Sequence, residues 1–248
     1  MISRRRFIAT GASGVLLGGC DKLDRSPAFK GVLRSAEHLT MGTQRLVGGR
    51  NSLAREFSEA DLSPVFRSNG TAMPDTSEYA QHLAANFANW KLGVGGLVAR
   101  PLAIPIQTIR SLPHRTQITR HDCVEGWSAI GKWHGVQLSR ILDAAGLSTR
   151  AKYIVFHCAD RFGDTPYYES IDLVDAFHPQ TILAWGMNGH LLAVPHGAPL
   201  RLRVERQLGY KQAKYVQSIE AVESLSGIGG GKGGFWEDNA DYEWYAGI

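Results

Sequence analysis

Hydrophobic and polar residues follow two different periods along this chain, which predicts a domain built from both helices and strands. Between residues 136 and 145, apolar residues recur at helical spacing, and Gly146 follows where a C-terminal cap belongs. Residues 171–177 indicate one further short helix. Apolar or alternating stretches predict strands within residues 90–105, 153–159, 200–204 and 215–222. No repeat or linker divides residues 60–248, so we expect one mixed α+β domain there.

The first twenty residues have the pattern of a targeting segment that is not part of the fold. Three consecutive arginines at residues 4–6 precede a short apolar run, which resembles a twin-arginine export signal. The run ends in Leu-Gly-Gly-Cys, which resembles a bacterial lipobox whose cysteine, Cys20, becomes lipidated. We therefore expect residues 1–20 to be a leader, residues 21–59 a tether and N-terminal extension, and residues 60–248 the functional domain.

Charge and hydropathy narrow the classes of partner. The chain carries 27 basic and 23 acidic residues, and the three leader arginines account for most of the excess. The chain that follows the leader is nearly neutral in net charge, so there is no electrostatic basis for a nucleic-acid partner. No long uncharged apolar run is present, so we expect no membrane-spanning helix in the mature chain. Asp21, directly after Cys20, resembles an inner-membrane retention signal, so we expect a lipid on Cys20 to hold the protein at the periplasmic face of the inner membrane.

The remaining cysteines, Cys123 and Cys158, either form one disulfide or act separately. The motifs Cys-x-x-Cys, His-Glu-x-x-His and Gly-x-Ser-x-Gly are absent from the sequence that follows the leader. Thiol exchange, zincin and α/β-hydrolase chemistry therefore lose their usual support.

The C-terminal region combines a glycine tract with an aromatic tail. In residues 227–234, Gly233 follows Lys232 where a phosphate loop carries Ser or Thr, and the tract lies beyond the strand-rich core instead of opening a helix. We interpret it as a flexible surface loop. The aromatic residues between 235 and 245 are costly to leave in water, so we expect them to pack onto the domain, with a partner surface as the alternative.

Cys123 lies in a polar stretch after a predicted strand that ends near Thr119, and its thiolate would be a soft metal ligand. The pattern Cys-Val-Glu-x-Trp at residues 123–127, followed by Trp133-x-Gly-Val-x-Leu and a helix, resembles the molybdenum-binding segment of the sulfite-oxidase superfamily, in particular its small periplasmic reductase branch. The resemblance covers most of residues 62–222 and implies that Cys123 Sγ ligates molybdenum in a molybdopterin cofactor. Further matching blocks lie at residues 175–181, 187–189, 196–204 and 209–219.

The same resemblance implies cofactor-binding roles for seven more residues. They are Asn69, Cys158, His196, Arg201, Gln212, Ala213 and Lys214. The last three match the phosphate-binding stretch, and Lys214 supplies a point charge where Arg201 supplies a rigid fork of donors. From the residues alone, Arg201 is equally a solvent-facing strand residue, Asn69 a turn residue, and Cys158 a buried structural thiol.

Residues 160–169 follow the strand that carries Cys158, where substrate-facing loops are expected. Tyr168 and Arg161 are the candidates for a proton donor and an anion-binding residue, with solvated surface as the alternative. Four histidines lie outside the ligand spacing of any zinc motif, and we interpret them as structural residues. They are His121, His134, His157 and His178.

These features predict a periplasmic molybdopterin-dependent oxidoreductase that reduces small S-oxide or N-oxide substrates with electrons from a membrane cytochrome b. Sulfite oxidases carry an arginine shortly after the ligating cysteine, whereas Glu125 and Trp127 occupy this stretch here, which favours neutral substrates. The chain ends before the additional domain through which eukaryotic sulfite oxidases dimerise, so we expect a monomer. The alternatives are a sulfite-type oxidase, a non-catalytic lipoprotein with this fold, and a hydrolase with Cys123 as nucleophile.

Overall fold

The computed structural model describes residues 26–248. The expected export signal and Cys20 lie outside this range. The chain divides into one unit that ends at Gly49 and a second, compact unit that comprises Arg50–Ile248. The two units are described separately below.

The first unit contains α2 (Pro27–Gly48), a 22-residue helix where we expected a polar tether. Ser26 is its N-cap and accepts a hydrogen bond from the Phe29 backbone N–H at 3.4 Å, and a proline occupies the first turn. Gly49, with a φ of 74°, ends the helix. Within residues 26–248, no helix has both the length and the apolar character needed to cross a membrane.

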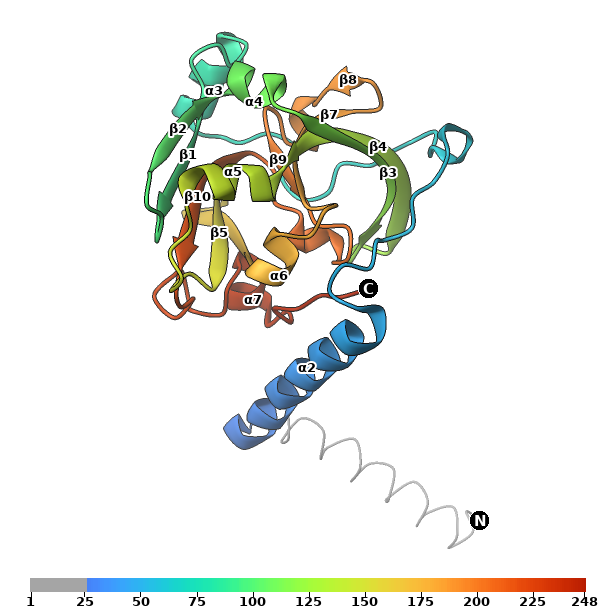
Figure 1. Cartoon of the computed structure of the whole chain (residues 1–248), viewed down its shortest axis with the longest axis vertical. Coiled ribbons are helices and arrows are strands. Elements are labelled where there is room, and N and C mark those ends of the chain that lie inside the picture. The colour runs from blue at the N-terminus through green and yellow to red at the C-terminus, as the bar shows by residue number, and fades with distance from the viewer. Residues whose placement is uncertain (1–25) are drawn as a thin grey trace, which may run out of the picture. The chain divides into compact units, whose positions relative to one another are not determined.

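The compact unit contains two sheets. The first five strands in chain order are β1 (Lys91–Gly96), β2 (Leu102–Pro105), β3 (His114–Cys123), β4 (Trp127–Gln137) and β5 (Tyr153–Phe162). The others are β6 (Thr165–Asp172), β7 (Ile182–Met187), β8 (His190–Leu191), β9 (Arg201–Arg203) and β10 (Val216–Val222). One sheet has the order β2-β1-β10-β5-β6, and the other has the order β3-β4-β7-β8 with β9 also paired to β7. Figure 1 shows β1, β2 and β5 on one side of the unit and the β3–β4 hairpin on the other.

Short helices connect these strands and cover the sheets. The α-helices are α3 (Ser77–Ala84), α4 (Ile106–Ser111), α5 (Leu138–Ala145), α6 (Leu173–Ala176) and α7 (Phe235–Ala240). The 3-10 helices are η1 (Glu59–Asp61), η2 (Val194–His196) and η3 (Gly209–Lys211). The expected helix over residues 136–145 is α5, and Gly146 caps it in the left-handed conformation. The mixed α+β fold that the sequence predicts is therefore confirmed.

The core lies between the two sheets and includes an unusual polar element. Trp133 of β4 is fully buried, and the guanidinium groups of Arg201 and Arg203 lie 5.0 and 4.2 Å from its ring centroid. The alternating pattern of residues 200–204 predicts a strand with one exposed face, but every residue of β9 is buried. The solvent-facing interpretation of Arg201 is therefore wrong, because protein covers both faces of this short strand.

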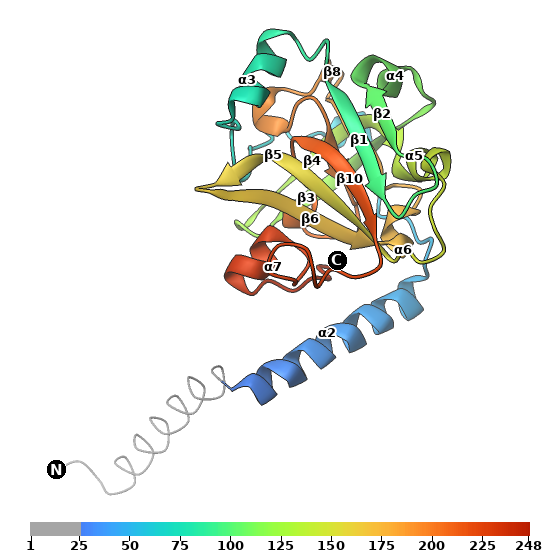
Figure 2. The same ribbon diagram turned by 90° about the vertical axis from the view of Figure 1, so that its left-hand side faces the viewer.

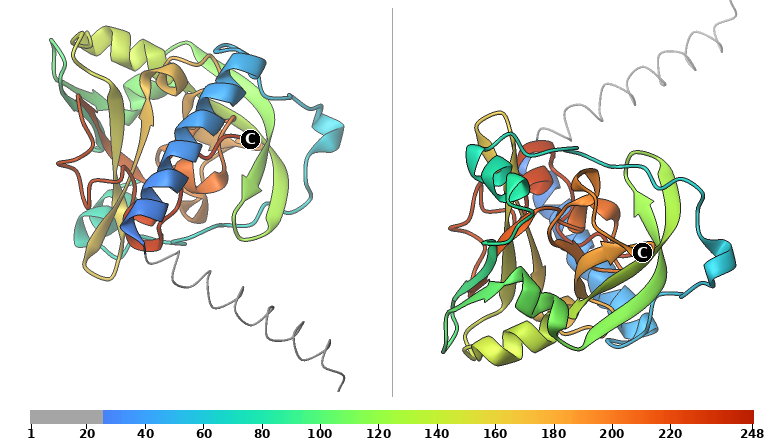
Figure 3. Two further views of the ribbon diagram at one scale, coloured as in Figure 1. Left: turned by 90° about the horizontal axis from the view of Figure 1, so that it is seen from below. Right: turned by 90° about the horizontal axis from the view of Figure 1, so that it is seen from above.

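The chain between Arg50 and η1 lies along the edge of β3. Glu56 forms an antiparallel bridge with Thr119, and the Phe57 backbone N–H donates to Ile118 O at 2.9 Å. These contacts tie the start of the compact unit to the strand that carries Cys123. Figure 3 shows the β3–β4 hairpin at one edge of the unit in both views, with this connecting segment beside it.

The glycine tract is packed around a carboxylate, in contrast to the flexible loop that we expected. The Asp238 carboxylate accepts hydrogen bonds from the Gly230 and Lys232 backbone N–H groups at 2.7 and 3.0 Å and from the Tyr168 hydroxyl at 2.5 Å. The tract also leads directly into α7, so our expectation that it opens no helix is wrong. The aromatic tail does pack onto the domain, and Figure 2 shows α7 beside β6.

Candidate functional site

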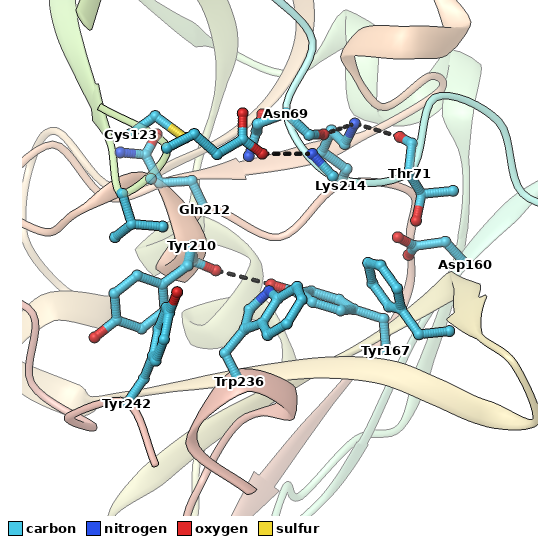
Figure 4. A pocket seen from close by; sticks show the side chains of 15 residues that line it. Asn69, Thr71, Cys123, Asp160, Tyr167, Tyr210, Gln212, Lys214, Trp236 and Tyr242 are labelled. Carbon is cyan, nitrogen blue, oxygen red and sulfur yellow. Dashed lines mark hydrogen bonds between the residues drawn. The ribbon is translucent and has the colours of Figure 1, made fainter. Parts of the chain in front are cut away.

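An open cavity lies in the compact unit at the end of β3. Its empty volume, together with the solvent space at its mouth, is about 550 Å³. Figure 4 shows aromatic side chains along one wall and most of the polar side chains along the opposite wall. The aromatic wall consists of Phe162, Tyr167, Tyr210, Trp236 and Tyr242. The polar residues that we discuss below are Asn69, Cys123, Asp160, Gln212 and Lys214. The sequence segments that meet here therefore extend along the chain from Asn69 to Tyr242.

Cys123 is the last residue of β3 and pairs with Trp127, the first residue of β4. The turn between them is closed by a hydrogen bond from the Gly126 N–H to Cys123 O at 3.1 Å, and Gly126 has a φ of +84° that favours glycine. The strand thus continues past its expected end near Thr119, and the turn holds Cys123 at the cavity. Burial raises the pKa of the Cys123 thiol.

The hydrolase alternative for Cys123 has no support in this geometry. A nucleophilic cysteine needs a base within hydrogen-bond reach. Within residues 26–248, no hydrogen bond joins Cys123 Sγ to a histidine, and the nearby His121 instead accepts from Arg203 Nη1 at 3.0 Å through its Nδ1. A raised thiol pKa also lowers the fraction of thiolate that could attack a substrate. A metal ion that binds the sulfur would displace the thiol proton.

Lys214 lies at the polar side of the cavity, against the loop of residues 68–71 (Figure 4). Its ammonium is buried and donates only to uncharged oxygen atoms: Ser68 Oγ at 3.4 Å, Asn69 O at 2.6 Å, Thr71 O at 2.5 Å and Pro195 O at 2.9 Å. Burial, reinforced by the Arg201 guanidinium, lowers the pKa of Lys214 to about 7. Among the described residues, no carboxylate forms an ion pair with this ammonium.

Arg201 is a second buried cation without a carboxylate partner. Its Nη1 and Nη2 donate to the backbone oxygens of His196 and Gln212 at 3.1 and 3.4 Å. Burial lowers its pKa to about 9, and the Arg203 charge acts in the same direction. Arg203, by contrast, forms a two-point ion pair with Glu205 at 3.0 and 2.6 Å. Arg201 and Lys214 are therefore two buried cations without a direct ion-pair partner among the described residues, and an anionic ligand would supply one.

Two buried polar atoms in this region, His196 Nδ1 and Arg201 Nε, lack a hydrogen-bond partner within the described chain. Buried polar atoms are normally satisfied, so this set indicates a bound ligand. Burial and the Arg201 charge lower the pKa of His196 to about 4, so its imidazole is neutral and can donate or accept. Together with the cations and the thiol, these donors and acceptors fit a heterocyclic ring that bears a phosphate and a metal.

The structure brings most of the expected cofactor residues together. Asn69, Cys123, Gln212 and Lys214 line the cavity. His196 and Arg201 are not part of this lining. Hydrogen bonds from the Arg201 guanidinium connect it to His196 O and to Gln212 O. Ala213 O accepts from the Leu202 N–H at 2.8 Å, so the phosphate-matching stretch is fixed against β9.

Three further expected residues also lie outside the cavity lining. Cys158 is buried on β5, both it and Cys123 are free, and the disulfide alternative is therefore not realised. The Tyr168 hydroxyl is engaged with Asp238 and with Ile228 O at 3.2 Å. Arg161 Nη2 donates to Asp164 O at 3.3 Å within the β5–β6 hairpin.

The cavity lining also contains residues that the sequence analysis did not identify. Tyr167 lines the cavity because neighbouring residues of β6 point to opposite faces, and its hydroxyl donates to Tyr210 O at 2.8 Å. Asp160 also lines the cavity, and burial raises its pKa to about 6 although Thr71 donates a hydrogen bond to it. Trp236 and Tyr242 arrive from the C-terminal segment, which no motif marked as part of the site.

Three of the four histidines that we interpret as structural have ordinary partners away from the cavity. His157 pairs with Glu220 at 2.9 Å, His134 with Thr116 at 2.8 Å, and His178 with Ser52 O at 3.0 Å. Within residues 26–248, no group of three or more His, Cys, Asp or Glu side chains is arranged to hold a metal ion.

Comparisons with known proteins agree with this geometry. The sequence matches the family described as "Oxidoreductase molybdopterin binding domain" over residues 79–227. It is 37% identical over 232 residues to the "Putative protein-methionine-sulfoxide reductase subunit YedZ1" of Azospira oryzae, which covers 94% of this chain and 82% of that protein. It is 33% identical over 244 residues to the protein-methionine-sulfoxide reductase catalytic subunit MsrP of Xanthomonas campestris, which covers 90% of this chain and 70% of that protein.

A solved structure shows the same fold. The crystal structure of the sulfane dehydrogenase SoxCD from Paracoccus pantotrophus superposes with a TM-score of 0.50 and 22% identity. The match covers 55% of this chain and 39% of that chain, so the fold corresponds to about two fifths of the larger protein.

Fold and site together define a molybdopterin-binding oxidoreductase of the sulfite-oxidase superfamily. The chain belongs to the oxidoreductase molybdopterin binding domain family, and its cofactor carries molybdenum. The predicted superfamily, enzyme class and cofactor are thereby confirmed.

Proposed function

We propose that this protein is a molybdenum-dependent reductase of methionine sulfoxide and related neutral S-oxides, and that the cavity beside Cys123 is its active site. The observation that carries the proposal is a free thiol in a region that also holds two buried cations without an ion-pair partner and two buried polar atoms without a hydrogen-bond partner. The cofactor, when bound, supplies two-electron redox chemistry with oxygen-atom exchange. The relatives named methionine-sulfoxide reductases support this choice of reaction.

In this proposal, Cys123 Sγ is the protein ligand to molybdenum, since a thiolate is the softest donor in the cavity. Asn69 at the cavity lining and the buried His196 Nδ1 and Arg201 Nε would hold the pterin through hydrogen bonds. The backbone of Gln212 and Ala213 and the ammonium of Lys214 would hold the phosphate. The chain's own residues thus orient the cofactor and neutralise its charge.

The cavity also favours a neutral substrate. Two carboxylates, Glu125 and Asp160, line it together with the aromatic wall. Glu125 is held in place by the Trp127 Nε1–H at 3.0 Å. A dianion such as sulfite would meet acid side chains and an apolar surface, whereas a methyl sulfoxide has an apolar end and one hydrogen-bond acceptor. Reduction of S-oxides is therefore preferred over a sulfite-type oxidase.

Steady-state kinetics of the cofactor-loaded protein test this preference. Reduced viologen would supply electrons to methionine sulfoxide, other sulfoxides and N-oxides, and sulfite would be offered in parallel with an artificial acceptor. We expect the highest kcat/KM with methionine sulfoxide. Efficient sulfite turnover without any oxide reduction would refute the proposed reaction, and it would leave the fold and the cofactor unaffected.

We further propose that the protein works as a monomer at the periplasmic face of the inner membrane, where a cytochrome b supplies electrons. The export pattern at residues 4–6 and the lipobox that ends in Cys20 support this location. The reaction itself requires two electrons for each oxide reduced, and in this proposal the cytochrome supplies them.

Replacing Cys20 with alanine should release the protein from the membrane fraction or block its processing, because the thiol is the point of lipid attachment in this proposal. Fractionation of cells that express the wild type and the variant measures the effect. Ser111→Ala, on the surface of the compact unit and outside α2, is a control that should fractionate like the wild type. A processed wild-type chain whose mass includes no acyl group would show that no lipid is attached at Cys20.

Replacing Lys214 with methionine should weaken cofactor retention about ten- to a hundredfold, because a charge-assisted contact is worth roughly 1.5 to 3 kcal/mol. The measurement is the molybdenum that remains bound after extended dialysis. Lys152→Met is the matched control, since Lys152 is exposed and lies 3.8 Å from Glu223 in a loose surface pair. Equal retention by the two variants would contradict the role of Lys214.

Cofactor uptake by the apo protein should weaken as the pH rises through about 7. Burial lowers the pKa of Lys214 to about 7, so its ammonium is charged below this pH and neutral above it. A phosphate requires the charged form, so binding above pH 7 must be accompanied by uptake of a proton. The dependence should disappear in Lys214→Met. Titration of the apo protein with purified cofactor at pH 6 to 9 measures it, and an identical slope in both proteins would contradict this interpretation.

A further inference from the structure

The helix α2 has an exposed apolar face that the active site does not use. Leu39, Leu46 and Val47 are 72%, 84% and 83% exposed. Leu39 and Leu46 lie seven positions apart, or two helical turns, and therefore share one face of α2. Phe29 and Ala36 extend the same apolar face toward the start of the helix by their spacing in the sequence. Scattered exposed apolar residues are normal, but a continuous helical stripe of them indicates a partner surface.

The opposite face of α2 is basic. By sequence spacing, His38 and Arg45 lie on the side that faces away from Leu39 and Leu46, and the sequence of the helix also contains Lys30 and Arg34. Glu37 is the one acidic residue among Pro27–Gly48. A strong apolar face, a basic face and a low mean hydropathy together define helices that lie in the interface of a bilayer. They do not define helices that cross it, in agreement with the absence of a spanning helix from residues 26–248.

The sequence also fixes α2 as a separate helix. Ser26 caps its start, and Gly49 ends it with a positive φ. Its length of 22 residues is about 33 Å at 1.5 Å per residue, enough for six helical turns on a surface. The compact unit begins directly afterwards, at Arg50.

We propose that α2 binds the surface of a bilayer that contains anionic phospholipids, with Leu39, Leu46 and Val47 inserted among the acyl chains and the basic face toward the headgroups. The helix would add a second membrane signal to whatever is attached at residue 20, and a single acyl chain alone gives only reversible binding. The proposal does not depend on the chemistry of the active site.

Site-specific fluorescence on the full chain tests this orientation. An environment-sensitive dye would be attached to a single added cysteine in a Cys20→Ala background, so that neither lipid nor dye occupies residue 20. Leu39→Cys and Leu46→Cys report on the apolar face. Met41→Cys is the matched control, because Met41 is also apolar but lies on the basic side of α2. The native Cys123 and Cys158 are buried, and the background protein without an added cysteine measures their labelling.

Vesicles of phosphatidylglycerol with phosphatidylcholine should shift the emission at residues 39 and 46 to the blue and leave the emission at residue 41 nearly unchanged. The shift should be smaller with phosphatidylcholine alone and should decrease at high salt, since ionic attraction is screened. Comparable shifts at all three positions, or none at residues 39 and 46, would overturn the proposal. Protection of residues 39 and 46 from an aqueous quencher before vesicles are added would show that protein covers this face and would also overturn it.

Discussion

Replacing Cys123 with serine is expected to leave a folded protein that has lost sulfoxide reduction by more than about a hundredfold. Even outer-shell changes at metal sites typically cost 10- to 100-fold, and an alcohol is a much poorer soft-metal donor than a thiolate. The substitution replaces the side-chain sulfur at the end of β3 by oxygen. The backbone hydrogen bond from Gly126, which closes the turn, is retained. Both the turnover rate and the molybdenum content of the purified protein measure the effect.

Cys158→Thr is the matched control for this experiment. Cys158 is buried on β5, does not line the cavity, and makes only a long contact of 3.9 Å from Sγ to Phe156 O. Threonine has nearly the same volume, so the change should be mild. Equal loss of activity and metal in the two variants would overturn the assignment of Cys123 as the ligand.

The second large effect is expected at Lys211, behind the aromatic wall of the cavity. Its ammonium lies 2.5 Å from Glu169 Oε2 and 2.5 Å from Glu237 Oε1, and all three side chains are buried. Burial, together with the neighbouring Glu237 carboxylate, raises the pKa of Glu169 well above its usual range. The single Lys211 cation thus stabilises two carboxylates, and the cluster connects β6, η3 and α7. Helix α7 also carries Trp236, which lines the cavity.

Lys211→Met should lower the free energy of unfolding by about 3 to 5 kcal/mol, because removing one partner leaves buried carboxylates without a counter-charge. Urea unfolding of both proteins in the same cofactor state measures it. Lys232→Met is the control: Lys232 pairs with Asp241 at the surface, where an ion pair contributes only about 0 to 1 kcal/mol. The deficit at Lys211 should shrink at low pH, where the Glu169 carboxyl group, whose pKa is raised, is neutral. A loss no larger than that of the control would contradict this account.

Much of the compact unit follows from local patterns. The strands near residues 153–159 and 215–222 and helix α5 appear where apolar spacing and Gly146 predict them. Helix α2 was missed because its many polar residues and two terminal glycines suggested a tether. The regular spacing of its apolar residues was the signal that could have revealed it.

The site was harder to predict because its side-chain directions depend on pairing between distant strands. Motif order predicted Asn69, Cys123, Gln212 and Lys214 as neighbours, and they line one cavity. Whether Tyr167 or Tyr168 faces that cavity depends on the register of β6 against β5, which no local pattern determines.

The contribution of the C-terminal segment was hidden for a different reason. Trp236 and Tyr242 reach the cavity only because a buried ion cluster and the Asp238 loop fold the tail back over β6. Tertiary contacts of this kind leave no periodic trace in the sequence.

The most direct test of the whole account is metal analysis combined with electron paramagnetic resonance on the full chain, produced in a bacterial host that makes molybdopterin. The account predicts molybdenum bound in each folded chain and a paramagnetic molybdenum signal on partial reduction, which Cys123→Ser abolishes or alters and Cys158→Thr preserves. Folded, exported protein that contains no molybdenum, or a signal insensitive to the Cys123 substitution, would contradict it.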